Sequence, residues 1–337
     1  MHVTVCICTR GRGASVVSTL QSIRASTYDD FDVVVVDQSA NDDTAQAVSE
    51  EVADDFRFTF IRSATVGSSV ARNIATAHAT GPLVAFTDDD CVVSANWLSV
   101  IVRAFSEHPD AGEVCGAVLP APHDQRLGFI PTCEITRFRR VTTRWHKRKA
   151  PGILANMAFR LDVLRAVGPF DEVLGAGGPL FSCADGDMTY RILRAGYVVL
   201  NVPEACVVHS GFRSWREGRP FMRRVGMGLG ATYFKHLRMG DLAVIPTLWY
   251  EWRRSVSWRR VLRLHGPTGV ARFFTFIKGI LVSFRYSIDR TTCTYIPIPQ
   301  AAPSGEVTGG ARSLVTDGHT LASVATAGTP LESEQCR

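Results

Sequence analysis

Short apolar runs and amphipathic stretches alternate along the first half of the chain. The runs are rich in β-branched residues, and the four consecutive valines at positions 33–36 are the clearest case. Continuous runs of this kind are typical of strands covered on both faces of a parallel sheet. The pattern therefore predicts an α/β protein with a doubly wound, mostly parallel sheet. The predicted strands cover residues 3–8, 32–36, 58–61 and 83–86, and the helices between them cover 44–52 and 70–79.

Capping residues indicate where the helices begin. Asp43 and Ser68 precede these two helices, and Ser94 precedes a third that starts at Ala95. A side-chain oxygen at such a position accepts a hydrogen bond from an otherwise unpaired N–H of the first helical turn. We therefore expect these three side chains to cap their helices.

Two further strands and a helix are predicted in the middle of the chain. The strands cover residues 113–119 and 197–200, and the second closes the sheet. The helix covers 186–195 and ends at Gly196, because glycine readily adopts the left-handed conformation that follows a helix. Residues 137–149 carry seven basic side chains and no acidic one, which predicts either a segment that faces an anion or a solvated surface loop.

The net charge of +5 conceals two regions of opposite sign. Residues 1–207 contain 19 basic and 24 acidic side chains, whereas residues 208–290 contain 16 basic and 4 acidic ones. A positive region of this size favours an anionic partner. No nucleic-acid recognition motif accompanies it, so nucleic acid is not an expected partner.

The last third of the chain combines arginines with aromatic residues. Residues 270–288 are nearly all apolar, but Arg272, Lys278 and Arg285 interrupt them, which disfavours a membrane-spanning helix. Three alternatives follow for residues 270–288. The helix lies in the membrane interface, it packs on a partner such as a second copy, or it is an ordinary buried helix whose Lys and Arg side chains extend their charged ends to water. After Pro297 the composition predicts a disordered tail. The expected domains are residues 1–210, 211–295 and 296–337.

Three adjacent carboxylates, Asp88, Asp89 and Asp90, follow an apolar strand. Ligands of open parallel sheets bind beyond the carboxyl ends of the strands, and three like charges repel one another unless a cation neutralises them. Hard ions such as Mg²⁺ are held by carboxylates together with substrate phosphates. The cluster therefore predicts a divalent metal site, with a solvated acidic turn as the alternative.

Two other element ends carry side chains suited to a nucleotide. Asp37 follows the second strand, where a carboxylate can accept hydrogen bonds from a base or a ribose. Residues 67–73 place a glycine and two serines at a helix start, with Arg72 close behind. Free amides and a guanidinium suit a diphosphate, although a plain capped helix fits the same residues.

Together these motifs resemble the family 2 glycosyltransferases, which have a GT-A fold. The resemblance covers about residues 3–210 and implies a GT-A type sheet followed by a helical, basic C-terminal extension. Residues 152–160 resemble the loop of that family that contacts donor and acceptor. The resemblance is carried by the order and spacing of Thr9 to Arg12, Asp37, the 67–73 stretch, the aspartates at 88–90 and Ala184-Asp185-Gly186-Asp187.

The resemblance also implies roles for individual residues. Asp88 and Asp90 would hold Mg²⁺ or Mn²⁺ on the diphosphate of a nucleotide-sugar, with Asp90 as the direct ligand, and His209 would complete the metal site. Asp185 would be the catalytic base, although Ala184 replaces the glutamate that precedes it in the family. Without the resemblance, Asp185 suits a helix N-cap and His209 a structural histidine. The nucleotide-sugar contacts would be Thr9, Arg12, Asp37, Arg72, Asp88 and Asp89.

The implied function is that of an inverting, metal-dependent glycosyltransferase. It would move a sugar from a nucleotide-sugar, with a UDP-sugar as the favoured donor, to a hydroxyl of a cell-envelope, polysaccharide or lipid-linked acceptor. A nucleotidyltransferase and an inactive membrane-associated binding module are the alternatives. A dinucleotide enzyme is disfavoured because Val16 replaces the third glycine of the motif that begins at Gly11. Unpaired cysteine spacing and the lack of a leader before the first strand predict a cytoplasmic location. The arginines and aromatic residues of the last third predict peripheral attachment to the inner face of the membrane.

Overall fold

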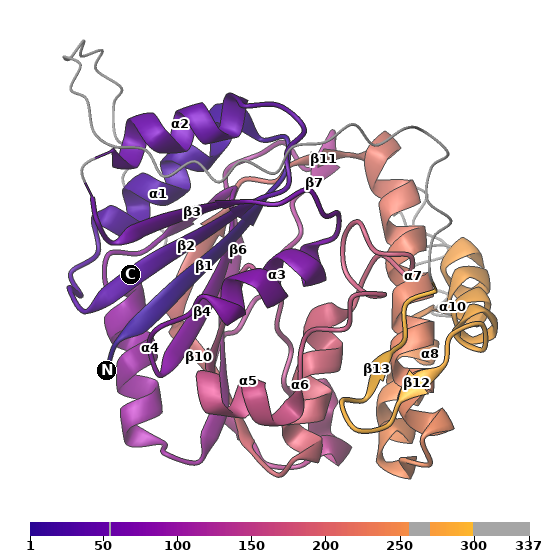
Figure 1. Ribbon diagram of the computed structural model, residues 1–337. Helices are drawn as coiled ribbons and strands as arrows, with labels where there is room; N and C mark the ends of the chain where they lie inside the picture. The colour runs from indigo at the N-terminus through magenta and orange to yellow at the C-terminus, as the bar shows by residue number, and fades with distance from the viewer. Residues whose placement is uncertain (54, 256–269, 299–337) are drawn as a thin grey trace. The chain divides into compact units, whose positions relative to one another are not determined.

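Nine strands form the central sheet of the computed structural model, which describes residues 1–53, 55–255 and 270–298. The strands of this sheet are β1 (Val3–Thr9), β2 (Phe31–Asp37), β3 (Phe58–Arg62), β4 (Leu83–Asp88), β5 (Cys91–Val93), β6 (Ala111–Pro120), β8 (Arg139–Val141), β9 (Asn156–Arg160) and β10 (Val198–His209). Their order is β3-β2-β1-β4-β9-β6-β10-β5, and β8 pairs with β10 outside this path. Figure 1 shows β1 to β4 side by side, as the apolar runs predict.

Parallel pairing holds where the sequence predicts it, in β1 with β2 and β4 and in β2 with β3. Three strands run antiparallel to their neighbours: β5 and β8 each pair with β10 in this way, and β9 runs antiparallel between β4 and β6. Residues 156–160, expected in a loop, thus lie in the middle of the sheet. The buried amide of Asn156 explains this placement, since it donates to the carbonyls of Ala117 and Ala205 at 2.8 Å each. The amide also accepts from the indole of Trp97 at 2.8 Å.

The register aligns the carboxyl ends of the first strands. Thr9 lies opposite Asp37, and Cys8 lies opposite Asp88. The last strand, β10, is longer than the predicted 197–200, and its final residue His209 lies opposite Cys91 of β5. Pairing across more than a hundred residues therefore brings His209 to the residue that follows the three aspartates.

Helices cover both faces of the sheet. One hydrophobic core holds side chains of α1, α2 and α4, and the other holds side chains of α3, α5 and α6. The doubly wound α/β prediction is therefore confirmed, with a mixed rather than wholly parallel sheet. The helices are α1 (Val16–Arg24), α2 (Asp43–Val52), α3 (Ser68–Ala77), α4 (Trp97–Glu107), α5 (Leu161–Val167) and α6 (Ala184–Arg194). Short 3₁₀ helices cover Gly13–Ser15, Arg144–Lys149 and Leu242–Val244.

The three predicted helix caps are wrong. Asp43 and Ser68 are the first helical residues of α2 and α3, and the residues before them make no side-chain cap. The hydroxyl of Ser94 donates instead to the carbonyl of Cys206 at 3.3 Å. At α3 the cap position belongs to Gly67, with φ of 130°. A glycine suits this position because side chains of the other residues rarely tolerate this φ, and nearby Gly177 is glycine for a second reason, since a Cβ there would lie 3.0 Å from the Gly67 Cα.

Helix α6 begins earlier than predicted, at Ala184, and its N-cap is Cys183. Asp185 therefore lies inside the first turn, and its interpretation as an N-cap is wrong. The predicted end is confirmed, because Gly196 has φ of 92° directly after the helix.

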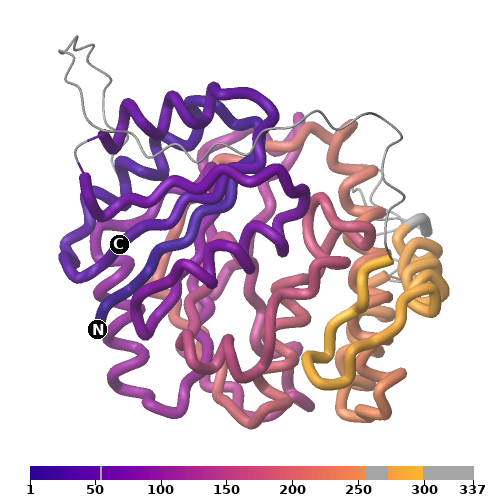
Figure 2. The backbone as a smooth tube through the Cα atoms, viewed as in Figure 1, coloured from indigo at the N-terminus to yellow at the C-terminus, as the bar shows by residue number. Residues whose placement is uncertain are grey.

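The C-terminal helices α7 (Trp215–Arg238), α8 (Ile245–Ser255) and α10 (Val270–Ser283) pack on one another. Figures 1 and 2 show α7 and α10 running side by side. Gly230 and Gly279 allow the close approach, because a Cβ on either would overlap the backbone of the other helix. One face of α10 is thus buried, whereas Phe274, Leu281 and Phe284 are exposed. Among the described residues, no helix has both the length and the apolar character to cross a membrane.

A buried ionic cluster ties α6 to α7 and to the end of the described chain. The ammonium of Lys235 lies 2.8 Å from Asp171 and 2.7 Å from Asp187, and His236 lies 2.9 Å from Asp187. Asp171 also accepts from the backbone N–H of Tyr295 at 2.8 Å, in the hairpin of β12 (Ile288–Asp289) and β13 (Thr294–Tyr295). Residues 1–297 form one compact unit. Of the disordered tail predicted for residues 296–337, residues 299–337 lie outside the described residues.

Candidate active site

A cleft of about 730 Å³ opens at the carboxyl ends of β1 and β4. Residues at the starts of α3 and α6 and residues of α7 and α8 line it. The point where strand order reverses, between β1 and β4, is the usual ligand site of an open α/β sheet. Most of the predicted site residues line the cleft: Thr9, Arg12, Arg72, Asp88, Asp89, Asp90, Asp185 and His209.

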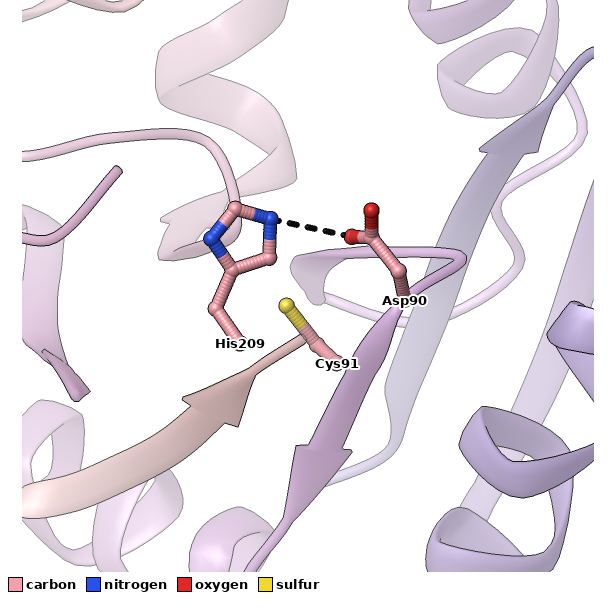
Figure 3. Close-up of side chains that lie close together, drawn as sticks. All are labelled: Asp90, Cys91 and His209. Carbon is pink, nitrogen blue, oxygen red and sulfur yellow. Dashed lines mark ion pairs between the residues drawn. The ribbon is translucent and has the colours of Figure 1, made fainter. Parts of the chain in front are cut away.

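Asp90 and His209 both line the cleft, and Figure 3 shows that their side chains face each other. The imidazole Nε2 of His209 lies 3.1 Å from Asp90 Oδ1, and Cys91 lies beside both. The other ring nitrogen, Nδ1, lies 2.8 Å from the carbonyl of Pro131, which fixes the orientation of the ring. The antiparallel pairing of β10 with β5 places these side chains together, so the sequence could supply their identities but not their contact.

Opposite charges control the electrostatics around Asp90 and His209. Burial opposes ionisation of Asp90, but the hydrogen bond and charge of His209 and the charge of Arg12 hold the pKa of Asp90 below its usual value. Burial also disfavours the charged form of His209, yet its bond to Asp90 raises the pKa of the imidazole. Asp89 differs, because burial raises its pKa to about 6 against the opposing effects of Thr9 and Arg12. Arg12 lies 3.0 Å from Asp90 and 3.4 Å from Asp89.

The donor set that Asp90 and His209 provide fits a hard divalent ion. Asp90 supplies an ionised oxygen and His209 a nitrogen, which suit Mn²⁺ and Mg²⁺ better than a soft ion. Cys91 is an unsuitable ligand, since burial raises the pKa of its thiol well above the usual value. Gly211 leaves open space against both candidate ligands. A Cβ at this position would lie 2.6 Å from His209 Nε2 and 2.8 Å from Asp90 Oδ2.

Asp88 stands apart from the group formed by Asp90, Cys91 and His209. Its carboxylate is more exposed and lies 3.5 Å from the guanidinium of Arg72, which projects from α3. Arg72 is largely buried and its charge also lowers the pKa of Asp185. Arg72 therefore lies between the aspartate cluster and Asp185.

The two residues predicted at the first strand ends are buried. Thr9 lies beside Asp89 in the cleft. Asp37 is not among the cleft-lining residues, and it has a structural partner that the sequence did not suggest: the N–H of Ser39 donates to Asp37 Oδ1 at 2.9 Å. Its second oxygen, Oδ2, is buried and has no hydrogen-bond partner among the described residues. That oxygen is the part of Asp37 on which a nucleoside contact would depend.

Asp185 lies in the first turn of α6, partly exposed to the cleft. Burial raises the pKa of its carboxyl above the usual value, against the opposing effects of the Gly186 N–H and the charges of Lys147 and Arg72. The N–H of Gly186 donates to Asp185 Oδ1 at 2.6 Å. A carboxylate with a raised pKa accepts a proton more readily than an exposed one does.

A second buried carboxyl, Glu113 of β6, lies near Asp185. It accepts hydrogen bonds from Thr189 Oγ1 at 2.8 Å and from Cys115 Sγ at 3.0 Å. Burial raises the pKa of Glu113 to about 7, and the negative charge of Asp185 adds to the increase. Glu113 was not predicted as a site residue, because a lone glutamate in a strand is ordinarily exposed.

Three more residues that line the cleft were not predicted individually from the sequence. Lys147 is buried within the basic segment, and Arg213 follows His209 by four residues. Tyr233 of α7 packs against the start of α6, where a Cβ at Gly186 would lie 2.7 Å from its hydroxyl oxygen. The concentration of basic residues after position 208 was a signal for Arg213, whereas Tyr233 carried no local signal.

Comparisons with known proteins point to one enzyme family. The profile described as glycosyl transferase family 2 matches residues 4–167. A curated relative from Haloferax volcanii, named glucosyl-dolichyl phosphate glucuronosyltransferase, is 27% identical over 189 residues. The match covers 53% of this chain and 58% of that protein, so the chain spans little more than half the length of the relative.

Solved structures share the fold at low sequence identity. A mannosyltransferase from Pyrobaculum calidifontis, solved with GDP-Man and Mn²⁺, has a TM-score of 0.58 at 19% identity and covers 86% of this chain and 76% of its own. The S. aureus protein TarS, residues 1–349, has a TM-score of 0.58 at 17% identity, with coverage of 83% and 81%. The expected fold is confirmed: the chain shares the GT-A fold of these structures, and its residues 4–167 match the family 2 glycosyl transferases.

Proposed function

We propose that the chain is an inverting glycosyltransferase that uses a divalent ion, Mg²⁺ or Mn²⁺, and a nucleotide-sugar donor. The observation that carries the proposal is the single cleft that joins Asp90, His209 and Arg12 at one end with Asp185 at the other. The first group suits a metal-bound diphosphate, and the second suits a base. The acceptor is a hydroxyl of a glycan or of a lipid-linked molecule of the cell envelope.

The chemistry that we propose is one displacement at the anomeric carbon of the donor sugar. The acceptor oxygen forms a bond to this carbon while the bond from the carbon to the diphosphate oxygen breaks, and the electron pair leaves with the diphosphate. Asp185 takes the proton of the acceptor hydroxyl. A divalent ion held by Asp90 and His209 would neutralise charge on the diphosphate. Arg12 and Arg72 supply further positive charge at that end.

Two features of the relatives support the choice of substrates. TarS has been solved with UDP and with UDP-GlcNAc, and the mannosyltransferase with GDP-Man and Mn²⁺. We favour a UDP-sugar for this chain. The name of the H. volcanii relative includes a dolichyl phosphate, which supports a lipid-linked acceptor.

Attachment to the inner face of a membrane is part of the proposal. Exposed apolar side chains on α8 and α10, which include Trp249, Phe274 and Leu281, suit the apolar layer of a bilayer. The basic character of residues 208–290 suits an anionic leaflet. Contact between two copies through the same helices is the alternative use of these side chains.

Thermal unfolding with a panel of nucleotide-sugars, with and without Mn²⁺, tests the proposal. A ligand at about 100 times its Kd stabilises the folded state by roughly 2.7 kcal/mol, so we expect one UDP-sugar to raise the Tm in the presence of Mn²⁺. No response to any nucleotide-sugar with either ion would contradict the donor assignment. Release of pyrophosphate from a nucleoside triphosphate would favour a nucleotidyltransferase instead.

A further inference from the structure

The basic segment at 137–149 does not act as one patch. Arg140 lies 2.6 Å from Asp110, and Arg144 lies 3.1 Å from Asp241, so these two guanidinium groups are neutralised by acidic side chains. Lys149 is exposed and is not among the cleft-lining residues. Lys147 and Arg148 are the side chains of this segment that line the cleft.

Lys147 is the unusual member of the pair, because only 7% of it is exposed. Its ammonium donates one hydrogen bond, to the carbonyl of Ala150 at 3.1 Å. In the described part of the chain, no carboxylate lies within ion-pair distance of this ammonium. A buried charge is costly unless an opposite charge and further hydrogen bonds compensate it. The remaining N–H donors of Lys147 are therefore suited to an anion that enters the cleft.

The position of Lys147 places such an anion on the Asp185 side. Its positive charge lowers the pKa of Asp185 and opposes the rise in the pKa of Glu113, so the ammonium lies near both carboxyl groups. The metal end is served by other cations, Arg12 and His209, which contact Asp90 directly. The cleft thus has a second cationic position, on the side of the proposed base.

An apolar stripe on α7 also lines the cleft. Phe221, Met222, Val225 and Leu229 of α7 are spaced so that they share one helix face, and all four are half-buried. Tyr250 of α8 lines the cleft as well. Apolar side chains that remain partly exposed inside a ligand cleft favour an apolar portion of the ligand.

We propose that Lys147 and Arg148 bind a phosphate group of the acceptor, while the α7 stripe receives its apolar portion. The acceptor is then an amphiphilic phosphate ester whose hydroxyl reaches Asp185. This inference rests on the proposed function, because Asp185 defines the acceptor side. A lipid headgroup and a soluble phosphate share the anionic chemistry, and the two differ in whether the apolar stripe is used.

Binding of three soluble probes separates these sources. Octyl phosphate, inorganic phosphate and octyl glucoside are titrated by calorimetry below their micellar concentrations, with UDP and Mn²⁺ at saturation so that the donor end is filled. We expect octyl phosphate to bind at least about tenfold more tightly than either other probe, since only this probe satisfies both the ammonium and the stripe. Equal affinity for octyl phosphate and inorganic phosphate would overturn the proposal that the α7 stripe binds the apolar portion. Equal affinity for octyl phosphate and octyl glucoside would overturn the proposal that Lys147 and Arg148 bind the phosphate.

Variants assign the effect to Lys147. Lys147→Met should weaken octyl phosphate binding by about tenfold or more, because charge-assisted hydrogen bonds are the strong ones. Lys149→Met is the matched control, which removes the same charge two residues away at an exposed position and should leave binding unchanged. Val225→Ser should weaken octyl phosphate but not inorganic phosphate. Unchanged octyl phosphate binding in Lys147→Met would overturn the inference.

Two further measurements keep the test decisive. If Lys147→Met does not fold, Arg148→Gln replaces it, since Arg148 is exposed, and this variant should lose part of the octyl phosphate affinity. Unchanged affinity in Arg148→Gln would also count against the subsite. Stabilisation by UDP with Mn²⁺ is recorded for every variant. If wild type is stabilised by UDP with Mn²⁺ but does not bind octyl phosphate, the proposed acceptor subsite is wrong and the proposed donor site still stands.

Discussion

The two ends of the cleft hold carboxylates in opposite electrostatic states. At the metal end, Asp90 has cations within 3.0 and 3.1 Å, and its pKa lies below the usual value. At the other end, Asp185 has no ion-pair partner among the described residues, and burial raises its pKa. Glu113, close by, has a pKa of about 7 for the same reason.

This difference suits two tasks. A carboxylate that must remain ionised to hold a cation needs opposite charges nearby, whereas one that must accept a proton benefits from a raised pKa. Carboxyl groups whose environments separate their pKa values are a common property of catalytic sites. This difference supports our proposal that Asp90 binds the metal ion and that Asp185 accepts the proton, and the variants below test it.

The largest effect is expected for Asp185→Asn. Removal of a general base commonly lowers turnover by about 10³-fold, while the affinity for UDP with Mn²⁺ should stay within a factor of about two because the metal end is unchanged. Initial rates and titration calorimetry measure the two quantities. Asp162→Asn, at an exposed position of α5, should keep the wild-type rate. Turnover near the wild-type value in Asp185→Asn would remove this residue from the mechanism.

Glu113→Gln sharpens the contrast through stability. The pKa of Glu113 rises from 4.5 to about 7 on folding. A carboxyl whose pKa is higher in the folded than in the unfolded protein favours folding fully at a pH below its unfolded-state pKa. This contribution is lost as the pH increases through its folded-state pKa. A shift of this size costs on the order of 3 kcal/mol.

The glutamine does not titrate, so the variant should gain about 3 kcal/mol relative to wild type between pH 4.5 and pH 8. Urea unfolding at the two pH values measures the difference. The exposed Glu134→Gln should follow wild type at both. Parallel stability curves for Glu113→Gln and wild type would show that the carboxyl is not held neutral.

At the metal end, Asp90→Asn should weaken binding of UDP in the presence of Mn²⁺ by about 100-fold, because the variant removes the ionised oxygen while preserving shape. Binding of UDP without metal should change little. Asp124→Asn serves as the control, since Asp124 pairs only with Arg126 in an exposed turn of the described structure. If Asp124→Asn weakened UDP binding as much as Asp90→Asn does, the change in the net charge of the protein, and not the loss of a metal ligand, would explain the weaker binding.

A smaller effect is expected for Gly211→Ala. The added Cβ would lie 2.6 Å from His209 Nε2, so it should displace the imidazole or the ion and weaken Mn²⁺-dependent UDP binding by about tenfold. Mn²⁺ titration followed by electron paramagnetic resonance measures this directly. An unchanged Mn²⁺ affinity would mean that the space beside Gly211 is not used by the ion.

The smallest effect concerns the pH profile of turnover. Asp185 must be ionised to accept a proton, so the rate should fall as the pH decreases through its raised pKa, above the usual value of about 3.9. Lys147 lowers this pKa, and Lys147→Met should move the acid limb upward by less than about one pH unit. Lys149→Met should not move it. An acid limb at the same pH in both variants would show that Asp185 and Lys147 are not coupled.

The local elements of the first half were predictable, because strand and helix periodicities are written in neighbouring residues. The predicted strands at 3–8, 32–36, 58–61 and 83–86 fall within β1 to β4. Helix starts were harder. Ser94 and Ser68 have capping chemistry, but Ser94 found a partner on β10 and Ser68 lies in the helix itself. Serine side chains can form hydrogen bonds with several nearby backbone groups of similar energy, and tertiary contacts decided which of these bonds formed.

The antiparallel strand β9 was missed for a related reason. Periodicity indicates that Met157 and Phe159 are buried but does not give the strand they pair with. The amide of Asn156, which bridges Ala117 and Ala205, is satisfied only after β6 and β10 are in place. A polar side chain at the centre of a sheet therefore records a long-range contact that local sequence patterns do not reveal.

The sequence by itself determined the strand ends and the acids that follow them, because parallel strands that start a doubly wound sheet must end at one edge. Only the tertiary structure decided which acid meets His209 and which of seven basic side chains enters the cleft. Those choices depend on the pairing of β10 with β5 and on the ion pairs that hold Arg140 and Arg144 elsewhere. Contacts between residues far apart along the chain form only when the whole core packs, so neighbouring residues cannot encode them.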